Sequence, residues 1–500
     1  MDGHNTIDRG DRADIIEGMN PRPTDIRVLE VESSTQTIPY RTPMKFGGRV
    51  VDSVTLLDVQ VTVENRSGAR ATGGGSMPMG VTWGWPRGET SGETKLLAML
   101  AIGRGALTCL YDDFAGDWID PLEASVRLSH SHAEIVEGVV ASLALAETPP
   151  RLAQLVAASP VEAAIFDAFG KAAGQSAYRM LGPEFIERDL ATYLRLNAGA
   201  APYAAALTEM LSTVSFADEW LDQYVLQAPR SRMPLYHLVG ALDPLTPAEQ
   251  TEPVSDGLPE TLAEWIDREG LTHLKIKLAG NDLEWDVARV LAVSAVADEA
   301  AGRRGHDGFQ FSLDFNEQCE NVDYLLTFLR HVKERGPRAY DRTQYIEQPT
   351  HRDLAAHPEN RVHAAAVLKP VVIDESLVDF ESFLLAREQG YSGVALKACK
   401  GHAEALLMAA AAQKFGMFLA VQDLTCPGAS FLHSASLAAW LPGIAGIEGN
   451  GRQYCPAGNA GWDEQYPGMF TIVNGRVGTG ALSGPGLGHV EPQAAGDGLV

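Results

Sequence analysis

The pattern of apolar and polar residues changes about halfway along the chain. From about residue 233, short apolar runs recur, and each is followed by a stretch with helical periodicity. The runs are MPLYHLVGAL, HLKIKLAG, FQFSLDFN, TQYIEQP, KPVVIDES, GVALKACK, MFLAVQDL and IAGIEGN. Strands that alternate with helices in this way predict a parallel (β/α)8-type barrel. An open doubly wound sheet would need a glycine-rich turn after the first strand, and GALDPLTP does not supply one.

The first part of the chain has a different pattern. Segments 26–38 and 53–65 are rich in Val, Ile, Leu and Thr with partial alternation, which predicts two strands. Glycine-containing segments 39–51 and 71–86 predict loops without regular structure. Helical periodicity extends from about 90 to 182.

Composition narrows the possible functions. The chain has 500 residues and a formal net charge of −25, which argues against binding to nucleic acid or to an anionic membrane surface. It contains no apolar run of about 18 residues, so we expect no transmembrane helix, and the N-terminus lacks the pattern of a secretory signal. Five cysteines without a CxxC pair indicate a reducing cytoplasm, with neither a disulfide framework nor a zinc site.

Three predicted barrel strands end in a carboxylate. Asp314 ends FSLD, Glu347 ends QYIE and Asp374 ends VVID, at intervals of about one strand–helix unit. Because consecutive strands are neighbours in a barrel, we expect these side chains to meet at the rim where barrel enzymes have their active sites. Adjacent unpaired carboxylates repel one another, and a hard divalent cation relieves that repulsion. The sequence therefore predicts one Mg²⁺ ion per site, with Mn²⁺ as the alternative.

Lysines lie on the strands to either side of the three acids. Lys275 and Lys277 share one face of a predicted strand before Asp314, and Lys397 ends the strand after Asp374. Ammonium groups in such a place require an anion opposite them, because a buried unpaired charge is costly. We expect that anion to be the carboxylate of a small-molecule substrate. A lysine on each face could then remove a proton beside the carboxylate and return it from the other side.

At these residues the sequence resembles the enolase superfamily, in its muconate-lactonizing-enzyme-like branch. The resemblance covers roughly residues 25–490, without 183–232. It is carried by an ordered set of motifs: KIK at 275–277, DFN at 314–316, IEQP at 346–349, IDES at 373–376 and LKACK at 396–400. The related mandelate-racemase-like branch uses an Asp and a His on later strands, so Lys397 decides the branch.

The resemblance implies an α/β fold in which a (β/α)7β barrel is covered by an α+β capping domain, built from the N-terminal region and the C-terminal tail. It divides the chain into five parts: a flexible arm (1–23), the capping domain (24–182), an insertion of uncertain role (183–232), the barrel (233–465) and the return to the capping domain (466–500). We expect the short strands of the return to rejoin the N-terminal sheet.

The resemblance also implies residue roles. Asp314, Glu347 and Asp374 would bind Mg²⁺, and Lys277 and Lys397 would be the acid/base pair. Lys275 would help to neutralise the substrate carboxylate, while Asn316 and Glu375 would support the metal ligands. The remaining substrate-contact candidates lie on capping-domain loops or at the last strand ends: Phe46, Arg49, Trp83, Gln422, Asp423, Glu448 and Asn450. Dipeptide epimerases of the family have two aspartates where this chain has Glu448 and Asn450.

The main functional hypothesis is a Mg²⁺-dependent racemase, epimerase or cycloisomerase of an acidic small molecule, cytoplasmic and homo-oligomeric. A dehydratase or synthase that eliminates a group from the same enediolate is the nearest alternative. A metal-free Schiff-base aldolase would not need three rim carboxylates. A noncatalytic protein with the same fold would be expected to lose at least one of the five lysine and acid residues, yet all are present.

Overall fold

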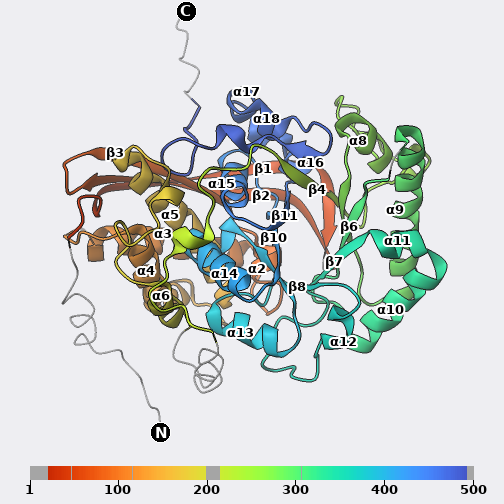
Figure 1. The fold of residues 1–500 in the computed structure, drawn as a ribbon, viewed down its shortest axis with the longest axis horizontal. Helices are drawn as coiled ribbons and strands as arrows, with labels where there is room; N and C mark the ends of the chain where they lie inside the picture. The colour runs from red at the N-terminus through yellow and green to blue at the C-terminus, as the bar shows by residue number, and fades with distance from the viewer. Residues whose placement is uncertain (1–20, 47, 115, 199–213, 306, 493–500) are drawn as a thin grey trace, which may run out of the picture.

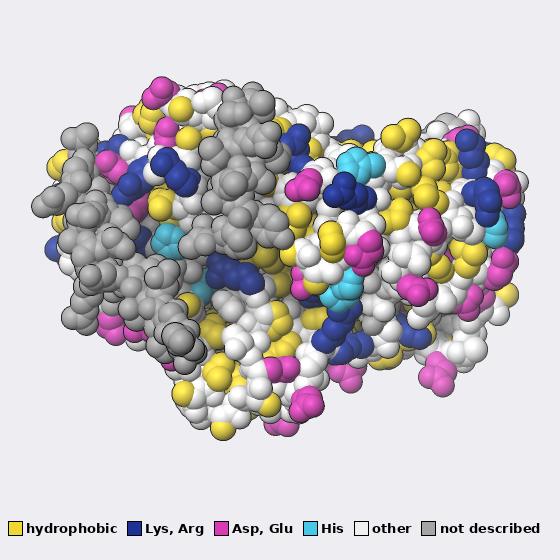
Figure 2. Space-filling model, turned by 90° about the horizontal axis from the view of Figure 1, so that it is seen from below, with side chains coloured by type: hydrophobic (Ala, Val, Ile, Leu, Met, Phe, Trp, Pro, Cys, Tyr) yellow, Lys and Arg dark blue, Asp and Glu magenta, His cyan; other side chains and the backbone are white. Residues whose placement is uncertain are grey.

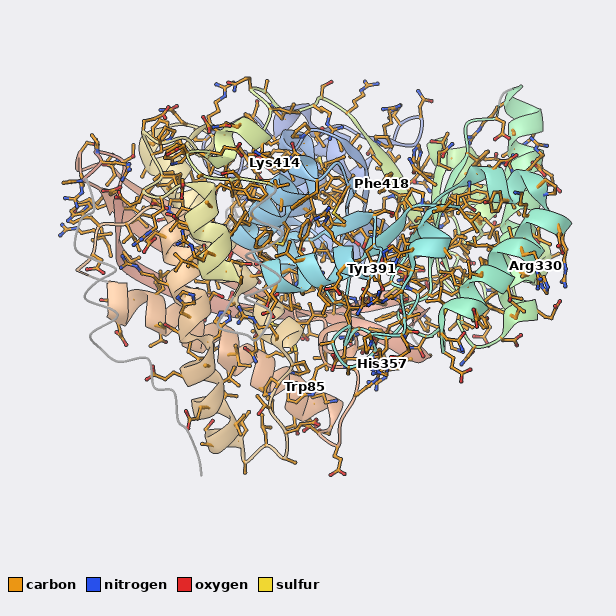
Figure 3. All side chains as sticks on the ribbon, turned by 60° about the horizontal axis from the view of Figure 1, so that its bottom comes forward. Trp85, Arg330, His357, Tyr391, Lys414 and Phe418 are labelled. Carbon is orange, nitrogen blue, oxygen red and sulfur yellow. The ribbon has the colours of Figure 1, made fainter. Side chains whose placement is uncertain are left out.

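The computed structural model describes residues 21–46, 48–114, 116–198, 214–305 and 307–492. The predicted flexible arm falls almost wholly outside this range. A closed parallel barrel forms one part, and a three-stranded antiparallel sheet with long helices forms the other (Figure 1). Figure 3 shows Trp85 low in the view, beside the capping helices, and Arg330 at the right-hand edge, on a barrel helix.

The barrel confirms the predicted order of strands. Neighbouring strands follow one another along the chain, and the last strand pairs in parallel with the first, so the sheet closes. Its strands are β4 (Met233–Val239), β5 (His273–Lys277), β6 (Gln310–Asp314), β7 (Thr343–Glu347), β8 (Val371–Ile373), β9 (Gly393–Leu396), β10 (Phe418–Val421) and β11 (Ile444–Glu448).

Helices cover the outside of the barrel. They are α8 (Leu262–Glu269), α9 (Leu283–Arg304), α10 (Val322–Arg335), α11 (Pro337–Arg342), α12 (His363–Ala366), α13 (Phe380–Glu388), α14 (His402–Lys414) and α15 (Ala429–Trp440). Inside, Tyr236 and Tyr345 pack edge to face with ring centroids 5.8 Å apart, together with Val372, Ala395 and Ala420. This apolar layer forms a solid floor beneath the carboxyl ends of the strands.

The N-terminal sheet is larger than the sequence predicts. Strands β1 (Ile26–Phe46) and β2 (Arg49–Asn65) form one long hairpin, so the predicted loop at 39–51 is wrong. The prediction of an irregular segment at 71–86 is also wrong in part, because β3 (Arg70–Pro78) pairs along β2. The short helix α2 (Val81–Gly84) follows it.

The glycines of β3 allow this strand to lie directly against a helix. A Cβ atom on Gly75 would lie 1.8 Å from the carbonyl oxygen of Pro160, and one on Gly73 would lie 2.2 Å from that of Ala164. At the open edge of β3, the Gly74 N–H donates to Asp167 and the Ser76 N–H donates to His433. The glycine run therefore serves close packing of a strand whose edge N–H groups are capped by side chains.

Three long helices complete this part: α3 (Gly92–Phe114), α4 (Pro121–Leu143) and α5 (Arg151–Ala173). By length and composition α5 could cross a membrane, but 94% of its apolar window is buried inside the protein, as in the core helix of a globular domain. Pro160 lies within α5 and cannot donate to the Val156 carbonyl. The Ser159 hydroxyl donates to that carbonyl instead, at 2.8 Å.

Residues 183–232, whose role the sequence leaves open, run along the barrel helices wherever they are described. The helix α6 (Leu190–Asn197) is followed by a segment in which Phe216 packs against Phe380 and Phe415. Further on, the Leu226 N–H donates to the Trp440 carbonyl. The described part of the insertion thus joins the capping helices to α13, α14 and α15.

The C-terminal segment differs from the prediction in its strand pairing. After α16 (Gly451–Tyr454), α17 (Trp462–Gln465) and α18 (Pro467–Phe470), strand β12 (Arg476–Val477) pairs antiparallel with β4 of the barrel. The prediction that this strand rejoins the N-terminal sheet is therefore wrong. The residues that follow do return to the capping side, where the Leu487 N–H donates to Asp167 of α5.

Charge is not segregated on the surface that Figure 2 shows. Lys and Arg side chains alternate with Asp and Glu over the described part of this face. The net charge of −25 is thus compatible with a local surface of mixed sign.

Two buried glutamates lie where the cap meets the barrel. Glu162 of α5 accepts a hydrogen bond from the Ala403 N–H of α14 at 3.0 Å, and Glu404 accepts one from Asn197 at 2.6 Å. Burial raises the pKa of Glu162 to about 8, and the nearby Glu404 adds to that shift. Burial also raises the pKa of Glu404 to about 7, with a further contribution from Asp379. Both carboxyl groups have a higher pKa in the folded protein than in the unfolded chain. The folded state therefore binds their protons more tightly, and this stabilises the protein fully below about pH 4.5.

The stabilisation that comes from the raised pKa values of Glu162 and Glu404 should disappear as the pH rises from about 5 to about 8. We expect the Glu162→Gln variant, which mimics the protonated acid, to flatten the decline of the free energy of unfolding over that range. Chemical denaturation at a series of pH values measures it. Glu137→Gln, an exposed change on α4, is the matched control. An unchanged slope in Glu162→Gln would contradict the assigned titration.

Candidate active site

The predicted acids meet at the carboxyl ends of the barrel strands. Lys277, Asp314 and Glu347 are level with one another in the register of β5, β6 and β7. Glu347 pairs with Val372 of β8, and Asp374 follows immediately after that strand. All three carboxylates are fully buried. Strand register, rather than loop conformation, therefore brings the predicted metal ligands to one rim.

Lys275 occupies the centre of the site. Its Nζ lies 2.8 Å from Glu347 Oε1, 2.8 Å from Glu448 Oε2 and 3.2 Å from Asp314 Oδ2. Burial lowers the pKa of Lys275, but Glu347 and Glu448 outweigh burial and raise it well above the ordinary value. Lys275 is therefore an ammonium ion that ties the acids of β6, β7 and β11 together.

The two other lysines approach from opposite sides of the barrel. Lys277 Nζ lies 2.5 Å from Asp314 Oδ2 and 3.0 Å from Asn316 Oδ1, whereas Lys397 Nζ lies 2.9 Å from Asp374 Oδ2. Their strands, β5 and β9, are separated by β6, β7 and β8 in the closed ring. Since a ring of eight strands places such a pair across the barrel, the lysines face the acids from two sides.

Electrostatics in the site follow from these pairings. Burial and the nearby Asp314 and Asp374 carboxylates raise the pKa of Glu347 well above its ordinary value. For Asp314, burial acts upward, but Lys277 and Lys275 bring the pKa below the ordinary value. Burial lowers the pKa of Lys397, and Asp374 reverses this, so that the net pKa is raised. Lys397 is therefore protonated while it is paired with Asp374.

The donor atoms fit a hard divalent cation in type and burial. Asp314, Glu347 and Asp374 offer only carboxylate oxygens, which Mg²⁺ prefers. Both Asp374 oxygens are buried and paired with lysines, and the buried Oε2 of Glu375 accepts no hydrogen bond from a described residue. As these side chains are oriented, no three His, Cys, Asp or Glu side chains within the described residues converge closely enough to hold a metal ion. In this arrangement the acids are paired with lysines.

Aromatic rings from the capping domain lie over both outer lysines. Phe46, at the end of β1, has its ring centroid 5.6 Å from Lys277 Nζ, and Trp83 of α2 has its ring 4.3 Å from Lys397 Nζ. The Trp83 indole N–H also donates to Glu375 at 3.1 Å. The side chain of Arg49, by contrast, is exposed at the start of β2 and makes no hydrogen bond or ion pair with a described residue. Phe46 and Trp83 thus lie at the site, and Arg49 does not.

The remaining predicted residues connect strand ends. Asn316 Nδ2 donates to Glu375 Oε1 at 3.1 Å, beside the Trp83 indole. At β10 and β11, Gln422 donates to Glu347, and the Asn450 side chain donates to Glu448 at 3.2 Å. These hydrogen bonds fix the carboxylates of Glu375, Glu347 and Glu448.

Asp423 lies just after β10 and contacts the segment that follows β11. Its carboxylate accepts a hydrogen bond from the Asn450 N–H at 3.1 Å, and burial raises its pKa to about 7. Its contacts are therefore with backbone rather than with the lysines.

One buried lysine at the site was not predicted. Lys400 Nζ donates to the Asp374 carbonyl at 2.5 Å and to the Leu377 carbonyl at 3.2 Å, and it lies 3.2 Å from Asp374 Oδ1. Gln348 holds the same turn from the other side, because its Oε1 accepts the Asp374 N–H at 3.0 Å. Its amide also donates to the hydroxyl of Tyr391, labelled in Figure 3. The only sequence signal for Lys400 was its place in LKACK.

We expect Lys400→Met to displace Asp374 without removing any predicted ligand. The variant should bind Mg²⁺ about ten- to a hundredfold more weakly, because residues that orient metal ligands typically have effects of that size. Isothermal titration calorimetry with MgCl₂ measures it. Lys400→Arg, which keeps the charge, should recover part of the affinity. Equal Mg²⁺ affinity in wild type and Lys400→Met would refute the role of Lys400.

Residues 257–493 match the model of the enolase C-terminal domain-like family. The barrel belongs to that family. This confirms the superfamily that the sequence motifs indicated. No curated protein matches the chain.

Solved structures with the enolase-type fold align over most of the chain. The L-Ala-D/L-Glu epimerase from Bacillus subtilis, in a substrate-liganded complex, is 18% identical, with a TM-score of 0.58 over 92% of this chain and 98% of that chain. The dipeptide epimerase from Enterococcus faecalis V583, complexed with Mg and L-Leu-L-Tyr, is 17% identical, with a TM-score of 0.56 over 92% and 99%.

A muconate lactonizing enzyme from Pseudomonas fluorescens, complexed with muconolactone, is 17% identical, with a TM-score of 0.53 over 92% and 96%. At these identities the comparison shows a shared fold: an enolase-type barrel with a capping domain.

Proposed function

We propose that the protein is a Mg²⁺-dependent isomerase of the muconate-lactonizing-enzyme-like branch, which removes a proton next to the carboxylate of a small acid. The observation that carries this proposal is the placement of Lys277 and Lys397 on opposite strands of an enolase-type barrel, with three buried acids between them. The similar structures with Mg and with small-molecule ligands support the same class of reaction.

Asp314, Glu347 and Asp374 would hold the cation, which would stabilise negative charge on the substrate carboxylate after the proton leaves. Lys275, fixed by Glu347 and Glu448, contributes a permanent positive charge beside that carboxylate. These groups lower the barrier for removing a proton from a weak carbon acid.

The proton transfers would be performed by the outer lysines. One of Lys277 and Lys397, in its neutral form, takes the proton from one face of the substrate carbon. The other, as an ammonium ion, delivers a proton to the opposite face, which inverts the configuration. In the structure Lys397 is paired with Asp374, so substrate turnover requires that this pair be loosened before Lys397 can accept a proton. The rings of Phe46 and Trp83 limit the access of water to both amines.

The substrate should carry a hydrogen-bond donor at the end away from its carboxylate. Gln422 Oε1 and Asn450 Oδ1 are buried acceptors without a partner among the described residues. Glu448 is already paired with Lys275, so the end of β11 offers a neutral rather than a strongly acidic contact. An amide N–H or a hydroxyl suits these acceptors better than a second carboxylate.

The experiment that tests the proposal is a screen of small chiral carboxylic acids for exchange of the α-proton in D₂O with Mg²⁺ present. Exchange with inversion supports an epimerase or racemase, and intramolecular ring formation supports a cycloisomerase. Elimination of a leaving group would assign the protein to the lyases instead. Trapping of a covalent adduct by borohydride without a metal requirement would contradict the proposal.

The setting of the enzyme is also a proposal. Cys319, Cys399, Cys426 and Cys455 are buried free thiols, which supports work in a reducing cytoplasm. We propose that it acts as a homo-oligomer on a free small molecule, without nucleic-acid or membrane partners. Size-exclusion chromatography with light scattering tests the oligomeric state, and a monomer would contradict it.

A further inference from the structure

Arg41 links the hairpin of β1 and β2 to a loop of the barrel. Arg41 Nε and Nη2 contact the two carboxylate oxygens of Asp256 at 2.5 and 2.8 Å. Its Nη1 also donates to the Pro259 carbonyl at 3.1 Å. Only 7% of the Arg41 side chain is exposed. The Asp256 side chain is 34% exposed, but the two-point geometry and the buried arginine make this pair stronger than a single-contact surface salt bridge.

The loop that receives Arg41 is itself well anchored. It connects β4 to α8, and within it Glu260 accepts hydrogen bonds from the Val254 and Ser255 N–H groups at 2.9 and 2.7 Å. Arg268 of α8 donates to the Gly257 carbonyl at 2.8 Å. Arg41 therefore binds to a part of the barrel that is already ordered, rather than to a loose loop.

Beyond Arg41, the hairpin extends over the candidate active site. Met44 packs with Leu238 of β4 and Tyr454 of α16, and Phe46 lies over Lys277. Arg41 and Phe46 lie on the same strand, β1, and Arg41 falls in the irregular stretch between the paired residues Pro39 and Met44. The ladder with β2 is interrupted there, so the Arg41 contacts contribute to fixing the strand before it reaches Phe46.

We propose that Arg41 is a positioning residue for the active site. Its contacts with Asp256 and the following loop hold the hairpin closed, so that the Phe46 ring covers Lys277, and molecules reach Lys277 when this contact opens. The significance for catalysis rests on the proposed function, in which Lys277 exchanges a proton with the substrate. The closure itself does not depend on that role.

The test measures access to Lys277 directly in the full-length protein. Wild type and Arg41→Ala are treated with sulfo-N-hydroxysuccinimide acetate, and the acetylation rate of each lysine is followed by peptide mass spectrometry. We expect Lys277 to be acetylated about tenfold faster in Arg41→Ala, because a forked charge-assisted contact is lost. Lys397 is covered by Trp83 from another segment, so its rate should stay at the wild-type value. Amide hydrogen exchange of residues 39–46 should rise in parallel.

Matched variants separate closure from general loss of stability. Arg27→Ala removes an arginine–glutamate pair of the same strand far from the hairpin tip, and it should leave the Lys277 rate unchanged. Asp256→Ala should reproduce most of the effect of Arg41→Ala, because Arg41 then keeps only its contacts with the Leu258 and Pro259 carbonyls. The double variant should add nothing beyond Arg41→Ala, because both changes break the same ion pair. Arg41→Lys, which keeps the charge without the fork, should give an intermediate rate.

An unchanged Lys277 rate in Arg41→Ala would overturn the inference, and so would an equal rise at Lys277 and Lys397. These readouts need neither substrate nor Mg²⁺. A failure of the proposed function, such as the absence of proton exchange in wild type, is thus distinguishable from a failure of the closure.

Discussion

Replacement of either outer lysine by alanine should lower turnover about a thousandfold or more while the fold survives. A positioned general acid or base typically contributes a factor of about 10² to 10⁴, and here the same group must both accept and donate a proton. Lys277 and Lys397 also pair with Asp314 and Asp374, so each variant removes one of the two lysine partners of a buried acid. Circular dichroism and thermal melting will show whether the barrel stays folded.

The two variants should differ in stereochemistry. Both enantiomers of a substrate are offered to each variant. Lys277→Ala should still exchange the α-proton on the face that Lys397 contacts. Lys397→Ala should still exchange the α-proton on the face that Lys277 contacts. Exchange into each enantiomer in D₂O, followed by NMR, measures this. Lys171→Ala, which breaks an ion pair with Asp167 on α5, is the matched control and should keep full activity. Near-normal turnover in either variant would rule out that lysine as an acid/base group.

Asp314→Asn should weaken Mg²⁺ binding at least about a hundredfold. The change keeps the volume of the side chain but removes a carboxylate charge from a cluster of three buried acids. Because Mg²⁺ binds charged oxygen ligands far more strongly than neutral ones, the loss should be visible by calorimetry without any substrate. Removal of divalent cations with EDTA should abolish activity, and added MgCl₂ should restore it.

A half-buried aspartate outside the acid cluster provides the control for the metal experiment. Asp243 accepts a hydrogen bond from Tyr454 at 2.6 Å, so Asp243→Asn perturbs a hydrogen-bonded carboxylate without touching the predicted ligands. It should bind Mg²⁺ like wild type. Equal Mg²⁺ affinity in Asp314→Asn and wild type would show that Asp314 is not a ligand.

The parts that the sequence predicted well depend on short-range patterns. Each barrel strand is a short apolar run followed by a helix, and this pattern is local. The level placement of Lys277, Asp314 and Glu347 then follows from the parallel register of adjacent strands, so three residues far apart in sequence could be brought together by counting strands.

The parts that it did not predict depend on contacts distant in the sequence. The glycines of β3 indicated a loop, but Gly73 and Gly75 are needed because α5 lies directly against the strand. The short strand β12 pairs with β4, about 240 residues earlier, a choice that neither segment encodes by itself. Segment 39–51 forms part of a long hairpin, and its end is fixed by Arg41 and the β4–α8 loop.

Within the site, the sequence indicated which charged residues lie there but not which residues they contact. Lys275 was expected to face a substrate carboxylate, yet its nearest anions are Glu347 and Glu448 of the protein. Lys400 contacts the backbone of the Asp374 turn, which no periodicity indicates. Arg49 was a candidate because of its hairpin position; it pairs with Phe46 in the strand register, but its side chain is exposed.

The proposed mechanism requires a cation bound by three carboxylates, with two lysine amines on opposite faces of the bound substrate. The most direct measurement is a crystal structure of the protein grown with MgCl₂ and a carboxylic acid for which α-proton exchange has been found. We predict electron density for one cation bound by Asp314, Glu347 and Asp374, with Lys277 and Lys397 on opposite sides of the α-carbon. A cation bound elsewhere, or both amines on one side of that carbon, would contradict the account.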